Sequence, residues 1–436
     1  MMPKHRCNWL AERLVRHVFL LVLALTMVAD PASVDANWRL SAASQAKARQ
    51  KTASKSKTKT KKPSKTAKSK SAEQTAKPAE DTSDPVKAEL LMEAASGLVI
   101  VENNADTAYA PASMVKMMTV YIVMEEIANG RLSLDTPVTA SARASKTGGS
   151  QVYLKEHEVF PVTELLDAIL VHSANDACIA LAEHIAGSVD AFVDRMNAKA
   201  TELGLSKTQF GSVHGLPPSP GQTPDRSSAR DMAMLGRALI TRFPEVLERS
   251  KIQQMTFRDG KMVLDNTNKL LKTFPGTDGI KTGFCDEAGF CVTATAERDG
   301  MRFIAVVMGG RGSTVRFDAA ARLLSQGFGQ FERRRLAQTG QMVDVLVPIA
   351  DGSIAEIRPV VSHDVFAVVE RAKASEIILH VPTPTPLTAP VIRGTVCGQA
   401  FFQLDGHDLA LVELIVPHDV PKRSLWQRVI GWLPGS

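Results

Sequence analysis

A mostly apolar stretch, residues 117–127, follows a short segment that contains one serine and one lysine, Ala-Pro-Ala-Ser-Met-Val-Lys. A helix with apolar side chains on nearly every face is stable only inside a large domain, where other elements cover all of its sides. Pro111 and Ala112 precede the run, and proline is favoured in the first turn of a helix. The sequence therefore predicts a buried central helix that opens near Pro111.

The first turn of this helix would contain Ser113 and Lys116. Residues three apart lie on one face of a helix, so the hydroxyl and the amine can touch, as a nucleophile and its base must. Free backbone N–H groups and the positive end of the helix dipole also point toward whatever approaches Ser113. Ser-x-x-Lys by itself is a weak indication, because the spacing occurs by chance in many helices.

The chain has 436 residues, enough for two domains with appendages, and a formal net charge of +6. Residues 1–85 hold 17 of the 52 basic and 7 of the 46 acidic residues, so residues 86–436 hold 35 basic and 39 acidic residues. The excess positive charge therefore belongs to the N-terminal part. The remainder is mildly acidic, which argues against a nucleic-acid partner.

Residues 1–36 resemble a secretory signal peptide, with a basic start, an apolar run over residues 18–29 and small residues at plausible cleavage positions. An uncleaved anchor is the alternative, although the run is short for a membrane span. Residues 37–85, rich in Lys, Ser, Thr and Ala, predict a disordered tether. The tether is either a solvated spacer or a segment attracted to anionic lipids or wall polymers. A signal peptide and an uncleaved anchor would both place the protein outside the cytoplasm, in the periplasm or on the outer face of the cytoplasmic membrane.

Residues 86–336 alternate between strand and helix patterns and predict an α/β domain in the broad sense, with one antiparallel sheet flanked by helices. Residues 337–418 contain short β-like runs separated by Pro and Gly, which predict a small all-β domain. The expected strands are residues 90–93, 98–102, 277–284, 290–296, 301–308, 342–347, 356–361, 365–369, 377–381, 394–401 and 409–415, and the expected helices are residues 162–171, 177–186 and 317–331.

Residues 419–436 would form an amphipathic helix with an aromatic, apolar face and a basic face. Such a helix suits peripheral contact with an anionic membrane, and docking on its own domain is the alternative. The five cysteines show neither a disulfide framework nor a zinc spacing. Cys285 and Cys291 are either two buried thiols or a bridge across a hairpin. No cofactor or metal is expected.

Two further motifs follow Ser113-x-x-Lys116 in chain order, Ser173-x-Asn175 and Lys281-Thr282-Gly283. Such a set is typical of β-lactamases and penicillin-binding proteins. With its neighbours, 109–119, 172–177 and 278–283, the chain resembles the D-alanyl-D-alanine carboxypeptidase family of low-molecular-weight penicillin-binding proteins from residue 86 onward. The resemblance implies a β-lactamase/transpeptidase-like fold. A second Lys-Thr-Gly begins at Lys146, but we rejected it because it precedes Ser-x-Asn and lacks strand-like neighbours.

The resemblance assigns a role to each catalytic residue. Ser113 would attack the carbonyl of the penultimate D-alanine of a peptidoglycan stem peptide while Lys116 accepts its proton. Lys116 can do so only if its amine is substantially neutral, which burial or the nearby charge of Lys281 would promote. Ser173 would pass the proton to the leaving amine, and Asn175 would hold Lys116 and the substrate amide.

The substrate-binding residues are assigned in the same way. Backbone N–H groups of Ser113 and Phe284 would form the oxyanion hole. The terminal carboxylate of the substrate would bind Lys281 and Thr282 of the Lys-Thr-Gly motif, together with Arg316. The chain departs from many relatives at Cys285, where they have a threonine.

These roles predict a serine-type D-Ala-D-Ala carboxypeptidase, which β-lactam antibiotics would acylate. Three alternatives remain: an endopeptidase acting on crosslinked peptidoglycan, a class A β-lactamase, and an inactive wall-binding scaffold. A class A β-lactamase would need a glutamate in a Glu-x-x-Leu-Asn setting and a Ser-Asp-Asn motif, and the sequence contains neither.

Overall fold

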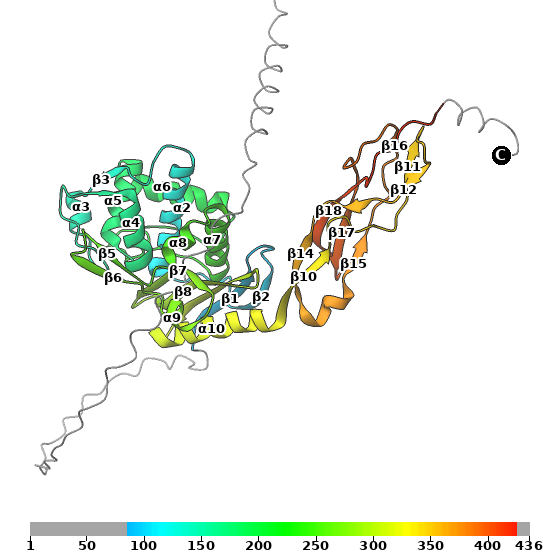
Figure 1. Cartoon of the computed structure of the whole chain (residues 1–436). Coiled ribbons are helices and arrows are strands. Elements are labelled where there is room, and N and C mark those ends of the chain that lie inside the picture. The colour runs from blue at the N-terminus through cyan, green and yellow to red at the C-terminus, as the bar shows by residue number, and fades with distance from the viewer. Residues whose placement is uncertain (1–84, 425–436) are drawn as a thin grey trace, which may run out of the picture. The chain divides into compact units, whose positions relative to one another are not determined.

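The computed structural model describes residues 85–424. The predicted signal peptide, nearly all of the predicted tether and residues 425–436 of the predicted amphipathic helix lie outside the described residues. The prediction of a helix is wrong for residues 419–424, which are extended: Val420 forms a β-bridge with Val391 and Lys422 with Gly352. The described chain begins almost immediately with the first strand of the main sheet (Figure 1).

The main sheet is antiparallel and has the strand order β2-β1-β9-β8-β7. Alternate residues of each strand point to opposite faces of the sheet, and both faces are buried. On β9, Ile304 and Val306 belong to one apolar core, whereas Phe303 and Ala305 belong to the other. The strands are β1 (Ala88–Glu93), β2 (Val99–Asn103), β7 (Thr277–Cys285), β8 (Gly289–Arg298) and β9 (Met301–Gly310), close to the predicted ranges.

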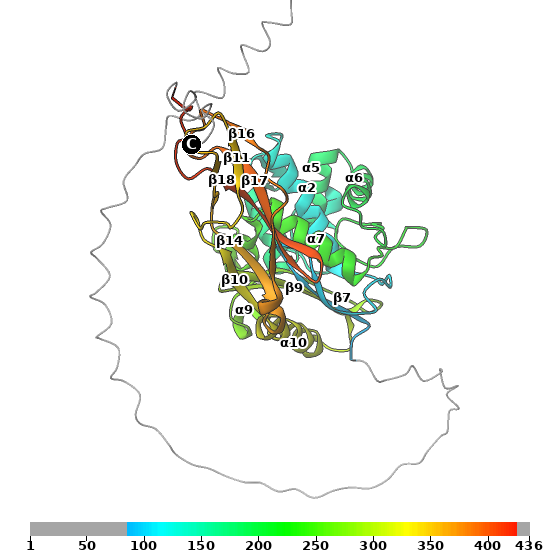
Figure 2. The same ribbon diagram turned by 90° about the vertical axis from the view of Figure 1, so that its right-hand side faces the viewer.

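Helices cover the two faces of the sheet unequally. In Figures 1 and 2, α10 (Ser313–Gln330) runs along one face, while α2, α5 and α7 lie on the other. The larger core is on the side of α2, and it leaves β7 as an edge strand beside the start of that helix. The helices of the larger side are α2 (Lys116–Ala128), α4 (Val162–Asp167), α5 (Asn175–Ala186), α6 (Val189–Glu202), α7 (Ala229–Arg242) and α8 (Val246–Ser250).

The central helix lies where the apolar run predicted it. A 3₁₀ turn, η1 (Ala112–Val115), leads directly into α2, and ten of the 13 residues of α2 are buried. The predicted helix over residues 162–171 consists of α4 followed by a π-helical turn, η2 (Ala168–His172). The next helix begins at Asn175, two residues before the predicted start. The long helix ends at Gln330, one residue before the predicted end.

Several short elements were not predicted from the sequence. Two small hairpins and two one-turn helices have too few residues to show a clear period. They are β3 (Pro137–Thr139) with β4 (Val159–Pro161), β5 (Gln254–Phe257) with β6 (Met262–Asp265), α3 (Ala142–Ser145) and α9 (Leu270–Thr273).

The C-terminal part is all-β with its own apolar core, as predicted. Its first strand, β10 (Phe331–Ala337), lies, except for its last residue, within the range predicted for the preceding domain, and it pairs with β14 (Val365–Glu370). Of the predicted strand 342–347, only the last residue belongs to a strand. The other strands are β11 (Val347–Ala350), β12 (Glu356–Ile357), β13 (Val360–Val361), β15 (Ile378–His380), β16 (Leu387–Thr388), β17 (Val396–Leu404) and β18 (His407–Ile415), with a 3₁₀ helix, η3 (Arg371–Glu376).

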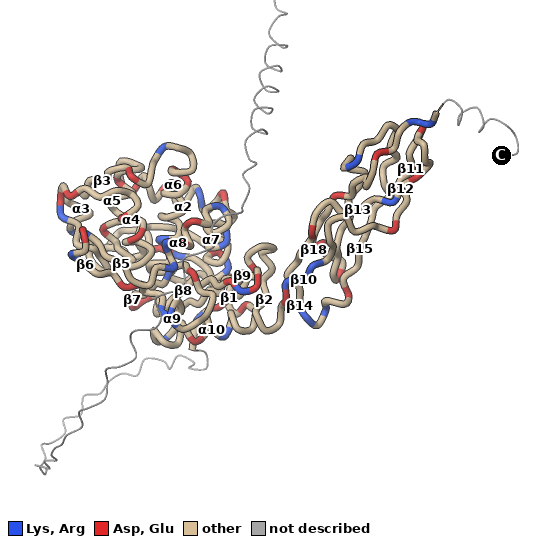
Figure 3. Tube along the Cα trace, viewed as in Figure 1, with Lys and Arg blue, Asp and Glu red and all other residues tan. Residues whose placement is uncertain are grey.

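The charged residues, the cysteines and the helices can each be compared with the sequence-based expectations. Basic and acidic residues are interspersed along the described chain (Figure 3). Cys285 pairs with Gly289 and Cys291 with Gly283 in the β7–β8 register, and both thiols are free, so the alternative of a bridge is wrong. Among the helices of residues 85–424, none has the length and apolar character needed to cross a membrane.

Candidate active site

Ser113 lies in the 3₁₀ turn that opens the central helix, and it is partly exposed. The preceding residue, Ala112, has a positive φ of 48°, a conformation that is uncommon for a residue with a side chain. Gly215 packs directly behind this peptide: a Cβ atom at Gly215 would lie 2.0 Å from the carbonyl oxygen of Ala112. The tight turn therefore presents the Ser113 hydroxyl at the end of a rigid, buried helix.

The Lys116 amine is completely buried and has three oxygen neighbours. Its Nζ lies 2.8 Å from Ser113 Oγ, 2.7 Å from Asn175 Oδ1 and 2.7 Å from the carbonyl oxygen of His214. A neutral amine has two N–H bonds and one lone pair. Because Asn175 Oδ1 and the His214 carbonyl can only accept hydrogen bonds, they take the two N–H groups and leave the lone pair directed at the Ser113 hydroxyl.

Burial lowers the pKa of Lys116 to about 8, against the opposing attraction of the Asp225 and Asp176 carboxylates. A substantial fraction of the amine is therefore neutral near physiological pH, as a general base requires. Burial is the largest cause of this lowered pKa, so the predicted need for a neutral lysine is met chiefly by burial.

The Ser173-x-Asn175 motif joins η2 to α5. Ser173 adopts a left-handed conformation with φ of 66°, and its hydroxyl is buried. Among residues 85–424, no group hydrogen-bonds to this hydroxyl. The Asn175 amide donates to the carbonyl of Gly148 at 2.7 Å, which sets its orientation and leaves Oδ1 for Lys116. Ser173 thus remains available to a substrate.

The loop before α4 supports this motif, a contact that was not predicted from the sequence. The Asn175 N–H donates to the carbonyl of Ser150 at 2.8 Å. The buried carboxylate of Asp176 accepts from the N–H groups of Val152, at 3.1 Å, and of Leu154, at 3.0 Å. The loop that follows the rejected Lys146-Thr-Gly is therefore attached to the site by backbone groups, which have no signature in a sequence.

The Lys281-Thr282-Gly283 motif lies on β7, the edge strand that packs against η1. Lys281 is 1% exposed, and burial followed by the charge of Lys116 holds its pKa well below the usual value for lysine. The Thr282 hydroxyl donates to Thr267 Oγ1 at 2.7 Å. The motif thus places a second buried lysine beside the one at Ser113.

Gly283 permits the close approach of β7 to the nucleophile. A Cβ atom at this position would lie 2.7 Å from the carbonyl oxygen of Pro111 and 3.2 Å from the backbone nitrogen of Ser113. Those distances are too short for a side chain, so the strand and the helix start can meet in this way only at a glycine.

Phe284 and Arg316 flank the motif. The Phe284 side chain is half exposed and stacks on Phe290, with ring centroids 4.2 Å apart. Arg316, in the first turn of α10, is 7% exposed and donates to the carbonyls of Gly283, at 2.8 Å, and Cys291, at 3.1 Å. Its observed contacts therefore hold β7 and β8, and a role in binding the substrate carboxylate stays a prediction.

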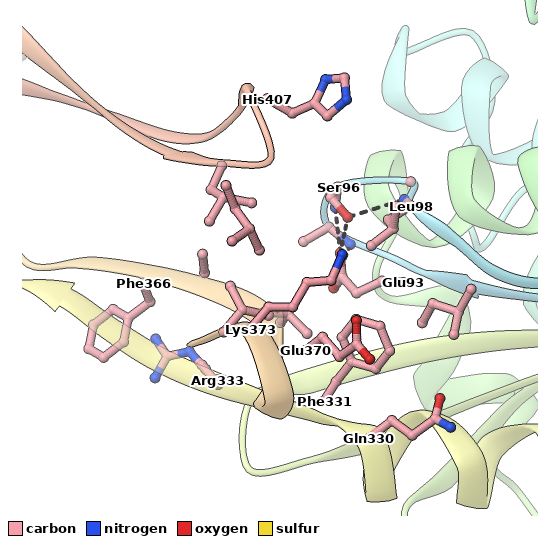
Figure 4. A pocket seen from close by; sticks show the side chains of 18 of the residues that line it. Glu93, Ser96, Leu98, Gln330, Phe331, Arg333, Phe366, Glu370, Lys373 and His407 are labelled. Atoms are coloured by element: carbon pink, nitrogen blue, oxygen red, sulfur yellow. Dashed lines mark hydrogen bonds between the residues drawn. The ribbon is translucent and has the colours of Figure 1, made fainter. Parts of the chain in front are cut away.

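Two other features of the described chain bear on the chemistry. No group of three or more His, Cys, Asp or Glu residues in 85–424 is arranged to hold a metal ion. Glu93 accepts from the N–H and hydroxyl of Ser96 in the turn between β1 and β2 (Figure 4). The hollow shown in Figure 4 lies beside this turn, and none of the candidate site residues lines it.

Comparison with known proteins supports the family resemblance on both parts of the chain. Residues 72–312 match the family model described as D-alanyl-D-alanine carboxypeptidase. Residues 331–422 match the model of the C-terminal domain of penicillin-binding protein 5. The second match begins with β10, in agreement with the pairing of that strand.

Curated relatives and solved structures agree with these matches. The D-alanyl-D-alanine carboxypeptidase DacC of Escherichia coli is 37% identical over 82% of this chain and 89% of its own length, and DacF of Bacillus subtilis is 33% identical over 80% and 90%. The crystal structure of penicillin-binding protein 5 from Haemophilus influenzae aligns with a TM-score of 0.63 and 32% identity, over 79% of this chain and 100% of that one.

A structure of penicillin-binding protein D2 from Listeria monocytogenes in its ampicillin-bound form aligns with a TM-score of 0.52 and 34% identity, over 57% of this chain and 100% of that one. The predicted fold is thereby confirmed: an antiparallel sheet flanked by helices, followed by an all-β part. With both parts matched and relatives aligned over most of its length, the chain belongs to the D-alanyl-D-alanine carboxypeptidase family.

Proposed function

We propose that Ser113 is the nucleophile with which this serine-type D-Ala-D-Ala carboxypeptidase removes the terminal D-alanine from peptidoglycan stem peptides. The observation that carries the proposal is the pairing of Ser113 Oγ with the buried Lys116 amine at 2.8 Å. The other acceptors around Lys116 direct its lone pair at the hydroxyl, and its pKa of about 8 makes that lone pair available.

Two side chains, those of Lys116 and Ser173, would carry protons between the Ser113 hydroxyl and the leaving amine. Ser113 Oγ forms a bond to the carbonyl carbon of the penultimate D-alanine while its proton passes to Lys116 Nζ. The Ser173 hydroxyl, which has no partner among residues 85–424, donates a proton to the departing amine and recovers one from Lys116. Breakage of the C–N bond releases D-alanine and leaves an ester on Ser113. Water then hydrolyses the ester by the reverse proton route.

The substrate's carboxylate explains the second buried lysine. Lys281 has a pKa well below the usual value in the empty site, and an arriving carboxylate would favour its charged form. Thr282 lies beside it on β7, and the N–H groups of Ser113 and Phe284 flank the closest approach of that strand to η1. We assign these two N–H groups to the oxyanion hole and the two side chains, with Arg316, to the carboxylate.

β-Lactams are covalent inhibitors in this scheme, because the acyl-enzyme that they form on Ser113 retains the leaving group. The predicted signal peptide supports export to the periplasm or to the outer face of the cytoplasmic membrane. The apolar and aromatic residues of 425–436, together with Arg428, support peripheral membrane contact by this segment.

Replacement of the nucleophile tests the proposal. Ser113→Ala should lower D-alanine release from a peptide ending in D-Ala-D-Ala by more than about 10³-fold, because the acyl-enzyme cannot form. Mass spectrometry after exposure to benzylpenicillin should locate the adduct on Ser113 in the parent protein. Ser145→Ala, on the short helix α3, serves as the matched control and should react normally. A penicillin adduct on the Ser113→Ala protein would contradict the assignment.

Two further assays on the same purified protein test the endopeptidase and β-lactamase alternatives. Release of monomers from a crosslinked peptide dimer reports endopeptidase activity. Rapid turnover of benzylpenicillin would support a β-lactamase instead.

A further inference from the structure

We propose that Asp225 and Ser212 are positioning residues that hold the His214 carbonyl on the Lys116 amine and so direct its lone pair at Ser113. The proposal deepens the proposed function and rests on Lys116 as the base. Neither residue belongs to the three motifs, and both lie in the loop between α6 and α7.

The His214 carbonyl matters because it is one of only two groups that fix the rotation of the Lys116 amine. With Asn175 Oδ1 and this carbonyl each accepting one N–H, the lone pair points to Ser113 Oγ. If the carbonyl moves away, the amine can rotate and direct an N–H at the serine instead. Proton transfer from Ser113 then loses its alignment.

The carbonyl is part of a turn, residues 211–215, that is held by one buried carboxylate. Asp225 is 7% exposed. Its Oδ1 accepts from the N–H groups of Gly211 at 2.8 Å and Ser212 at 3.0 Å, and its Oδ2 accepts from the Ser212 hydroxyl at 2.7 Å. The Ser212 hydroxyl in turn accepts from the N–H of Gly215 at 2.8 Å. Asp225 thus controls both ends of the turn that contains His214.

The turn is also tightly packed between two neighbouring segments of the chain. A Cβ atom at Gly211 would lie 1.8 Å from the carbonyl oxygen of Thr223, and one at Gly215 would lie 2.0 Å from that of Ala112. The turn therefore fills the space between the segment that contains Asp225 and the peptide that precedes Ser113. A shift of the turn would move both the acceptor for Lys116 and the backbone behind the nucleophile.

A second connection comes from the central helix. The Thr119 hydroxyl, one turn beyond Lys116, donates to the carbonyl of Val213 at 2.7 Å. Consecutive carbonyls of the turn, those of Val213 and His214, are therefore both bound by side chains of α2. Asp225 and Ser212 hold the opposite side of the same turn, which is why we assign them to positioning.

Asp225 also acts on Lys116 through its charge. The titratable groups around Lys116 are Asp176 and Cys178 on α5, Lys281 on β7, and His214 and Asp225 in the loop. Burial lowers the pKa of His214 to about 3, so its ring is neutral, and Nδ1 accepts the N–H of Leu216 at 3.1 Å. Burial raises the pKa of Asp225. When ionised, Asp225 stabilises the ammonium form of Lys116, so its removal should shift the titration of Lys116 to lower pH.

The test measures acylation by a fluorescent penicillin between pH 6.5 and 10 in the parent protein, Asp225→Asn and Ser212→Ala. In the parent protein the rate should rise with pH to a plateau, with a midpoint near the Lys116 pKa of about 8. Asp225→Asn should lower the plateau about tenfold, with an unchanged half-saturating penicillin concentration, and move the midpoint to lower pH. Ser212→Ala keeps the charge and should lower the plateau with a smaller displacement of the midpoint.

Asp231→Asn is the matched control. Asp231 is 2% exposed and also binds a neighbouring loop, accepting from the N–H of Lys207 and the hydroxyl of Thr208, each at 2.7 Å. Within residues 85–424 its hydrogen bonds go to neither Lys116 nor the turn, so the control should lower the melting temperature while it leaves plateau and midpoint unchanged.

Two results would overturn the proposal, and they are distinguishable. If Asp225→Asn and Ser212→Ala change only the melting temperature, as the control does, the pair is structural and Lys116 stands as the base. If the parent protein shows no rise of rate with pH, the assignment of Lys116 as base fails first.

Discussion

The chain contains the tripeptide Lys-Thr-Gly twice, and the two copies differ in secondary structure, burial and the partners of their threonines. Lys281 is 1% exposed on β7, whereas Lys146 is exposed just after α3. The Thr282 hydroxyl donates to the side chain of Thr267, a residue 15 positions away, whereas the Thr147 hydroxyl donates to the carbonyl of Arg143 within its own turn. One copy is part of the core and the other closes a one-turn helix.

Both copies nevertheless reach the site, through the carbonyl oxygens of their glycines. The Gly283 carbonyl accepts from Arg316, and the Gly148 carbonyl accepts from Asn175. The first copy contributes its lysine side chain and the close approach of its strand, while the second contributes only a backbone acceptor. The setting of the tripeptide therefore decides which of its groups are used: one copy lies on a buried edge strand and the other in an exposed turn.

The largest expected difference between the copies is at their lysines. Lys281→Ala should lower kcat/KM for a D-Ala-D-Ala peptide roughly 100-fold, because a hydrogen bond from a charged group to the substrate carboxylate is worth about 1.5–3 kcal/mol. Lys146→Ala should change it by less than about twofold, as expected for an exposed side chain. Steady-state kinetics on both variants checks this. Equal losses would mean that the exposed copy also binds substrate.

The two glycines should differ next. Gly283→Ala would place a Cβ atom 2.7 Å from the Pro111 carbonyl oxygen, whereas nothing lies within 4 Å of a Cβ atom at Gly148. Separation of β7 from η1 should slow acylation by benzylpenicillin about tenfold, since small misplacements of reacting groups are costly. Gly148→Ala should acylate normally, because its carbonyl remains available to Asn175. Normal acylation of Gly283→Ala would show that the close approach is dispensable.

The threonines should give the smallest difference. Thr282→Val removes a hydroxyl that donates to Thr267 and should lower kcat/KM about fivefold, close to the value of one neutral hydrogen bond. Thr147→Val removes a hydrogen bond that is internal to an exposed turn and should leave kcat/KM unchanged. Peptide kinetics at a fixed pH measures both. A larger loss at Thr147 would reverse the comparison and require the turn to touch substrate.

Sequence reasoning predicted the long elements well. The apolar stretch after Ser113 predicted the buried α2, and the apolar-rich runs predicted β7, β8 and β9. These elements are long, so each repeats its pattern several times. It missed β3 with β4 and β5 with β6, which have only three or four residues per strand. The predicted strand over residues 342–347 was wrong for nearly its whole length, because an apolar segment of six residues can also pack without a ladder.

The site was predicted less evenly than the fold. The Ser-x-x-Lys spacing was sufficient to expect contact between Ser113 and Lys116, since helical geometry brings such positions together. The third neighbour of Lys116 is a carbonyl of His214, 98 positions away, and every residue has a carbonyl. Arg316 could be named from the family resemblance, but its contacts with the Gly283 and Cys291 carbonyls could not.

The sequence alone was therefore sufficient to predict the family and the buried central helix, and it displays the order of the three motifs. The preference for Lys281 over Lys146 stays a prediction. The family, the helix and the motifs depend on side-chain identity and on periods of two or 3.6 residues, which a sequence displays directly. Only the tertiary structure decided which acceptors direct the Lys116 lone pair, how far burial lowers its pKa and that Asp225 holds the turn behind it. Those properties arise from backbone groups and exclusion of water, and both exist only after distant segments have packed together.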